Sequence, residues 1–201
     1  MASNSLGRIF SFTTAGESHG AGMGVIIDGC PAGIEIDTSF IQKELDRRRP
    51  GQSSITTQRK EGDKITIQSG VYEGKSTGAP ILILIPNEDS RPFDYDQVEQ
   101  AFRPSHADYT YHQKYGTRDH RGGGRSSARE TVNWVAAGAI AKLILRQAGI
   151  KINAAVSSVG TIQVEIPITA FDWEFAEQNP VRCPDSSTSF SMLTLIEETR
   201  D

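Results

Sequence analysis

The clearest hydrophobic pattern lies between Thr131 and Leu145, where apolar side chains recur at intervals of three and one residues. This spacing predicts a helix. Because polar residues are almost absent before Lys142, we expect most of that helix to be buried. Ser127 and Glu130 have the spacing of a capping box at its start, and Gly149 is a typical residue for its end.

Strands are predicted where β-branched and aromatic residues form short runs between turn residues. They are expected at Arg8–Thr14, Gly22–Asp28, Lys64–Val71 and Pro80–Pro86, with one strand or a pair of strands in Ile150–Val164. The ILILI core of Pro80–Pro86 is typical of a strand that is buried on both faces.

Shorter helices are predicted among these strands. Asp37 and Thr38 offer an N-cap to a helix that Pro50 and Gly51 end. Further helices are expected at Asp94–Phe102, Thr169–Gln178 and Ser186–Glu198. The combination of strands with long buried helices predicts an α/β (α+β) fold.

Two other stretches are expected to lack regular structure. Ser105–Asp119 is too polar for a core strand and too rich in bulky groups for a flexible linker. We therefore interpret it as an ordered loop whose side chains are directed into a pocket. Pro180–Ser189 is the best candidate for an exposed connection.

Composition narrows the class of protein. The 201 residues carry a net charge of −4 with a pI of about 5.6, which argues against nucleic acid as a partner. No apolar run is long enough to span a bilayer, and the N-terminus lacks the layout of a signal peptide. Cys30 and Cys183 lie far apart without metal-ligand spacing, so no metal site is expected. We expect a cytoplasmic protein that contacts no membrane, or a plastid protein if a transit peptide has been removed.

The segment Thr117–Glu130 concentrates the candidate chemistry. It contains four arginines, three consecutive glycines, one histidine and two serines, and it leads directly into the long predicted helix. Glycines let backbone amides approach a ligand closely, a helix start favours negative charge, and arginine adds forked, permanently charged donors. The segment matches neither a Walker loop nor a nucleophile elbow. We interpret it as a site for phosphate or carboxylate groups.

Two histidines are candidates for proton transfer. His19 lies in a tight Gly-Glu-Ser-His-Gly turn, where a purely structural role is the alternative. His106 lies between Arg103 and Asp108, whose opposite charges suit a proton donor tuned near neutral pH, and a solvated loop histidine is the alternative. Arg47–Arg49 end a predicted helix, where they either complement the helix dipole or contribute a side chain to a site.

Three long stretches resemble the chorismate synthase family: Gly16–Pro31, Leu45–Arg59 and Arg103–Lys142. The resemblance extends from Ser5 to about Gln163. It implies a β-α-β sandwich, usually assembled as a homotetramer. It also implies the 1,4-anti elimination of phosphate from 5-enolpyruvylshikimate-3-phosphate to give chorismate, a carbon–oxygen lyase reaction that needs reduced FMN without net redox change.

The resemblance implies roles for individual residues. His19 would protonate or neutralise the departing phosphate. His106 would lie beside the flavin and protonate or stabilise its reduced form. The anionic groups of the substrate would be bound by Arg49, Arg59, Arg103 and Arg129. FMN would be bound by Arg125, Ser126 and Ser127. NADPH would be bound by Arg48, in members that reduce their own flavin.

Three features depart from the family pattern. Ser105 stands where the family commonly has glycine, which would strain or re-aim the loop beneath His106. Ser54 stands where the family often has arginine, which weakens the case for NADPH as the flavin reductant. The family is also considerably longer, and its C-terminal part carries a further signature aspartate and much of the FMN site.

We therefore expect residues 1–201 to be the N-terminal portion of a single chorismate synthase domain, so that the sandwich is incomplete in this chain. Residues 168–201 match less well and are expected to form exposed helices. Such a chain is expected to be inactive alone. The alternative is an inactive truncated remnant that acts as an anion-binding or subunit-interaction module.

Overall fold

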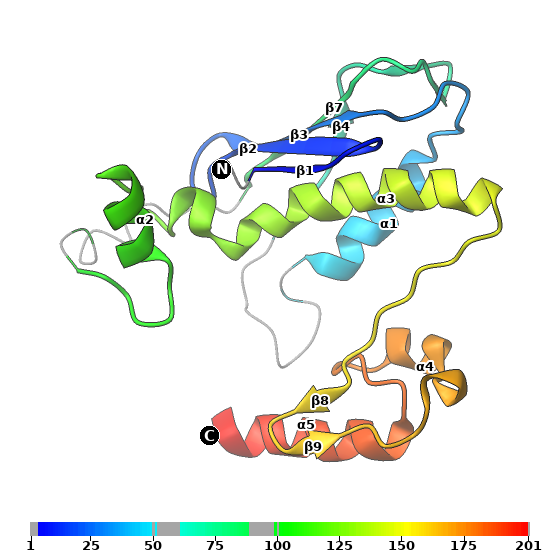
Figure 1. The fold of residues 1–201 in the computed structure, drawn as a ribbon. Coiled ribbons are helices and arrows are strands. Elements are labelled where there is room, and N and C mark those ends of the chain that lie inside the picture. The colour runs from blue at the N-terminus through cyan, green and yellow to red at the C-terminus, as the bar shows by residue number, and fades with distance from the viewer. Residues whose placement is uncertain (1–3, 50, 52–60, 89–98, 100, 201) are drawn as a thin grey trace. The chain divides into compact units, whose positions relative to one another are not determined.

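The computed structural model describes residues 4–49, 51, 61–88, 99 and 101–200. The chain divides into two compact units, Met1–Arg49 with Arg59–Ile150 and Pro50–Gln58 with Lys151–Asp201 (Figure 1). Each unit is described separately. Both helices and strands form, so the predicted α+β class is confirmed.

The first unit is built on a five-stranded antiparallel sheet. Its strand order is β1 (Ser5–Gly7), β2 (Ser11–Gly16), β3 (Gly22–Asp28), β7 (Ile81–Pro86) and β4 (Thr66–Ile67). Val25 of β3 pairs with Thr14 of β2 on one side and with Ile83 of β7 on the other. This register places Met23, Val25 and Ile27 beside Ile81, Ile83 and Ile85 on one face of the sheet.

Two helices cover that apolar face. Figure 1 shows α1 (Thr38–Arg48) and α3 (Thr131–Gln147) lying along the same side of the sheet. Both predicted helices are confirmed, and the side chain of Asp37 accepts a hydrogen bond from the Phe40 amide as the expected N-cap. Ile140 of α3 and Ile41 of α1 are fully buried in the shared core.

The strand predictions were accurate for β3 and less so elsewhere. β7 is buried on one face only, because Leu84 on the other face is 41% exposed, so its expected burial on both faces is wrong.

The predicted strand Arg8–Thr14 is shifted along the chain. Gly7 has a φ of +103°, the chain turns through residues 8–10, and β2 begins only at Ser11. Lys64–Val71 is shortened in the same way, because Gly70 at a φ of +79° separates β4 from β5 (Val71–Tyr72), which pairs with β6 (Lys75–Ser76).

The stretch Ser105–Asp119 contains a helix where we expected a loop. α2 spans Asp108–Tyr115, and Gly116 ends it with a left-handed backbone at a φ of +74°. Ser105, just before it, also has a left-handed φ of +61°. That conformation favours glycine, as expected from the family pattern at this position. The predicted helix Asp94–Phe102 falls mostly outside the described residues.

The second unit has a small core of its own. It combines the hairpin β8 (Ser158–Val159) and β9 (Ile162–Gln163) with α4 (Trp173–Gln178) and α5 (Ser186–Arg200). Cys183 and Met192 are fully buried in its apolar cluster. The prediction that Pro180–Ser189 is an exposed connection is therefore wrong. Its apolar residues supply part of the core, and the side chain of Asn179 binds both the amide and the carbonyl of Cys183.

Substitution of Ile83 by alanine should lower the free energy of unfolding of the first unit by about 2–5 kcal/mol, because it leaves a cavity beneath the helices. Substitution of the neighbouring Leu84, which points to the exposed face, by alanine should lower the same free energy of unfolding by about 0.5 kcal/mol or less. Urea unfolding monitored by Trp134 fluorescence in a Trp173→Phe background checks both values. Equal losses for the two variants would contradict the one-sided burial of β7.

Substitution of Ser105 by glycine should stabilise the turn before α2 by about 0.5–1 kcal/mol, because glycine adopts a positive φ without steric cost. Hydrogen exchange of the α2 amides is the measurement, and greater protection is expected. Ser191→Gly, inside α5, is the control and should lose stability instead. Reduced protection of α2 in the Ser105 variant would show that the serine fits this backbone better than glycine.

Candidate functional site

The candidate residues meet at the loop Gly122–Gly124, just before α3. All three glycines have positive φ angles, between +52° and +88°. A Cβ atom on the first would overlap the imidazole of His19, and one on the second would overlap the imidazole of His106. A Cβ atom on the third would overlap the carboxylate of Glu17. The loop therefore needs glycine for its backbone and for the space that these side chains occupy.

His19 lies in the turn between β2 and β3 and is 8% exposed. The hydroxyl of Ser18 lies 3.0 Å from its Nδ1 atom. Asn87, directly after β7, donates to the carbonyls of Glu17 and Gly20 at 2.9 and 2.8 Å. Both ends of the His19 turn are thus held by one amide side chain.

His106 is held by a charged cluster at the start of α2. The carboxylate of Asp108 lies 2.8 Å from its Nδ1 atom and accepts bonds from the side chain of Arg103 at 2.8 and 2.9 Å. Arg118 adds a further ion pair to Asp108 at 3.8 Å. The hydrogen bonds from Arg103 hold the pKa of Asp108 far below its ordinary value, although burial opposes them.

Arg129 lies in a second charged cluster and is 5% exposed. It forms an ion pair of 2.5 Å with Asp63, lies 3.6 Å from Glu61 and donates to Asn87 at 2.9 Å. Arg48 of α1 reaches the other oxygen of Asp63 at 3.3 Å. Two buried carboxylates therefore balance these two arginines.

Arg125 anchors the loop to the sheet. It donates to both oxygens of Glu130 at 2.6 and 2.8 Å, to the Gly16 carbonyl at 3.0 Å and to the Thr14 hydroxyl at 2.7 Å. These contacts fix the start of α3 against the end of β2.

The two serines that follow are bonded to nearby backbone. Ser126 donates to the Gly123 carbonyl at 2.7 Å, and the Ser127 hydroxyl accepts from the Arg129 amide at 3.3 Å. The capping box predicted for Ser127 and Glu130 forms only in part. Ser127 caps the short 3-10 helix Ala128–Glu130, whereas the Glu130 carboxylate binds Arg125. Ser127 retains its hydroxyl proton as a donor for a ligand.

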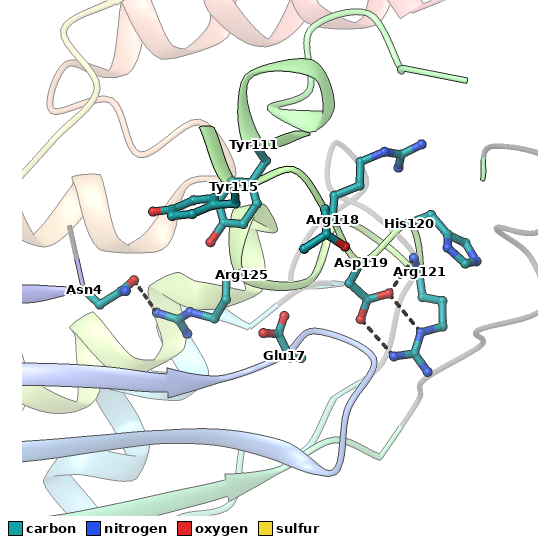
Figure 2. Close-up of a pocket in the computed structure, with 11 residues that line it drawn as sticks. Asn4, Glu17, Tyr111, Tyr115, Arg118, Asp119, His120, Arg121 and Arg125 are labelled. Carbon is teal, nitrogen blue, oxygen red and sulfur yellow. Dashed lines mark hydrogen bonds and ion pairs between the residues drawn. The ribbon is translucent and has the colours of Figure 1, made fainter. Parts of the chain in front are cut away.

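A cavity of about 860 Å³ opens beside the loop. Figure 2 shows Arg125 and Glu17 among the side chains that line it, with the ion pair between Arg121 and Asp119 at one side. Burial raises the pKa of Glu17, while the positive charge of Arg125 opposes that shift. Burial also acts to raise the pKa of Asp119, but the hydrogen bonds from Arg121 outweigh it and lower that pKa. The rings of Tyr111 and Tyr115 line the remaining wall, with centroids 4.8 Å apart.

The predicted site residues are only partly brought together. Arg49 lies at the end of α1, where it forms an ion pair of 3.7 Å with Asp46, and its side chain is 47% exposed. Of the three arginines Arg47–Arg49, Arg48 reaches the buried cluster at Asp63. Arg59 and Ser54 lie outside the described residues.

Sequence reasoning missed several residues that hold the site: Asn87, Glu61 and Asp63. Their partners lie tens of residues away along the chain, so no local motif marks them. For Asp108, the sequence predicts only a negative charge near His106. Among the described residues no group of three or more His, Cys, Asp or Glu side chains could hold a metal ion, and no described helix is long and apolar enough to cross a membrane.

Comparison with known proteins shows which family the chain resembles. The family model described as chorismate synthase matches residues 10–201. Among curated proteins, the chorismate synthases of Cytophaga hutchinsonii and Bacteroides fragilis are 57% and 58% identical over 198 and 193 residues. These alignments cover 98% and 96% of this chain but 55% and 54% of the relatives, so the chain spans about half the length of the curated relatives it matches.

A solved structure gives the same answer for the fold. A crystal structure of chorismate synthase superposes with a TM-score of 0.74 at 34% identity, covering 96% of this chain and 53% of that one. The α+β fold of this chain is therefore that of a solved relative, of which it covers about half. Because the family model extends over nearly all of its residues, the chain belongs to the chorismate synthase family.

Proposed function

We propose that this chain forms part of the active site of a chorismate synthase. The reaction is the 1,4-anti elimination of phosphate and a proton from 5-enolpyruvylshikimate-3-phosphate, which gives chorismate. The observation that supports it best is the meeting of His19 and His106 at the glycine loop before α3. Family membership supports the reaction class, and the arginine clusters on either side of the loop suit a substrate with a phosphate and two carboxylates.

The substrate's anionic groups are proposed to bind Arg49, Arg59, Arg103 and Arg129. Arg103 and Arg129 each already contact a buried carboxylate, Asp108 and Asp63. A substrate anion therefore binds by sharing the outer nitrogens of these arginines rather than by meeting bare cations. This requirement favours an oxyanion with several acceptor atoms, such as a phosphate, over a single weak acceptor.

His19 is proposed to give its proton to the departing phosphate. It is largely buried, and the Ser18 hydroxyl beside Nδ1 orients its ring. Asn87 holds the turn that carries it. A proton donor fixed in this way gives up little conformational entropy when phosphate leaves.

His106, Arg125, Ser126 and Ser127 are proposed to contact reduced FMN. The fit rests on two observations: Gly123 and Arg125 line the cavity beside the loop, and Ser127 keeps a hydroxyl proton to donate. When bound, reduced FMN would lend an electron to the substrate and recover it, so that no net redox change results. Arg48 is proposed as a contact for NADPH as flavin reductant, and the assembly as a homotetramer.

Because the chain spans about half the length of its relatives, we propose that activity needs the remaining half. A fusion of residues 1–201 to the rest of the Cytophaga hutchinsonii enzyme supplies that half, and the 57% identity favours a compatible interface. With dithionite-reduced FMN under nitrogen, the fusion should release phosphate from 5-enolpyruvylshikimate-3-phosphate, and residues 1–201 alone should not.

The His19→Ala fusion should lose roughly 10²–10⁴-fold in rate, which is the usual contribution of a proton donor. The intact relative is the positive control. If the fusion is folded and binds reduced FMN yet releases no phosphate, the proposed function is overturned. The chain would then be an anion-binding or subunit-interaction module, the alternative considered from the sequence.

Substitution of Gly122 by alanine in the fusion should lower kcat at least roughly tenfold, because the added methyl group displaces the His19 ring. Gly149→Ala is a matched control. Its φ of +69° is close to the +64° of Gly122, but nothing lies within 4 Å of an added Cβ. Both variants carry the same backbone strain, so a shared loss of activity would mean that strain, rather than contact with His19, explains the effect.

A further inference from the structure

The carboxylate of Asp108 is buried and surrounded by hydrogen-bond donors, which its position in the sequence does not predict. It is the first residue of α2 and is 1% exposed. One carboxylate oxygen accepts from the backbone and the Nε of Arg103, and the other accepts from the Nη2 of Arg103. The second oxygen also lies 2.8 Å from His106 Nδ1. A buried carboxylate with so many donors around it stays ionised and acts only as an acceptor.

That ionised carboxylate constrains the proton on His106. In a neutral imidazole one nitrogen carries the proton and the other carries a lone pair. A lone pair on Nδ1 would face the negative oxygen of Asp108 at 2.8 Å, whereas a proton there completes a charge-assisted hydrogen bond. The Nη2 of Arg103 lies 3.2 Å from Nδ1 and 3.4 Å from Nε2, so its position does not select one nitrogen over the other. The shorter contact with the Asp108 carboxylate therefore decides the tautomer, and it places the proton on Nδ1.

The other edge of the ring faces the glycine loop. A Cβ atom on Gly123 would overlap Cε1 and lie 2.8 Å from Nε2 of His106, so this edge of the ring packs directly against the loop backbone. The nitrogen that carries the lone pair is therefore the one on the loop side, next to the residues proposed to contact the flavin.

We infer that Asp108 is a positioning residue for the reaction, which sets the His106 tautomer to Nδ1–H and turns Nε2 toward the glycine loop. The catalytic consequence of this role rests on the proposed function. The tautomer itself is inferred from the contact between Asp108 and His106 and does not depend on that function. Arg103 shares the same carboxylate, so Asp108 aligns a proton-transfer group and a substrate-binding group together.

The tautomer can be read directly. Residues 1–201 labelled with ¹⁵N-histidine contain four histidines, and a His106→Gln variant assigns the signal. At a pH where the imidazole is neutral, long-range ¹H–¹⁵N correlation should show His106 with its proton on Nδ1. A proton mainly on Nε2 would overturn the inference without any variant of Asp108.

The Asp108→Asn variant tests the cause. An amide can donate to Nδ1, so the His106 tautomer should shift toward Nε2–H, and in the fusion kcat should fall roughly 10²-fold or more. KM should rise as well, because Arg103 loses its ionised partner. Asp37→Asn is the matched control, since asparagine is an equally good N-cap and α1 should keep its stability. An unchanged tautomer, or a changed tautomer with unchanged kcat, would overturn the role assigned to Asp108. Failure of the proposed function would appear separately, as no phosphate release from the unmodified fusion.

Discussion

The buried ion pair between Arg129 and Asp63 is the contact on which the site depends. Both side chains are almost inaccessible, at 3% and 0% exposure, so loss of either partner would leave an uncompensated charge in the interior. Such a loss typically costs about 3–5 kcal/mol. Arg129 also binds Asn87, which in turn holds both carbonyls of the His19 turn. One network therefore fixes the start of α3, the end of β7 and the position of His19.

The glycine loop follows from that constraint. With the start of α3 fixed to the sheet, the residues before it must turn back within three positions, and Gly122–Gly124 do so with three successive positive φ angles. The same turn brings three α-carbons against His19, His106 and Glu17. Glycine is thus required at these positions for two reasons: the backbone has positive φ angles, and neighbouring side chains fill the space that a Cβ atom would need. This close approach explains how two histidines that are 87 positions apart in the chain can both pack against one short loop.

The parts of the fold that were predictable are those governed by local patterns. β3 and α1 were predicted closely because alternation and the Asp37 cap act within a few residues. α2 was missed because it has no apolar period, and the Asp108 cluster and Gly116 end define it instead. Asn87 and Asp63 were missed for a different reason. They bind Arg129 from 42 and 66 positions away, and only the folded sheet brings them together.

The anion site predicted for Thr117–Glu130 has the expected residues but a different charge balance. Each of its four arginines is paired with a carboxylate: Arg118 with Asp108, Arg121 with Asp119, Arg125 with Glu130 and Arg129 with Asp63. An incoming anion must therefore share arginine nitrogens with the protein's own carboxylates. Its affinity depends on how far the new bonds between arginine and anion outweigh the weakened bonds between arginine and carboxylate. Glu17 affects that difference, because burial raises its pKa and it faces the loop at Gly124. Protonation of Glu17 removes one negative charge from the cavity, so the electrostatic balance favours anion binding more strongly as the pH falls through the pKa of Glu17.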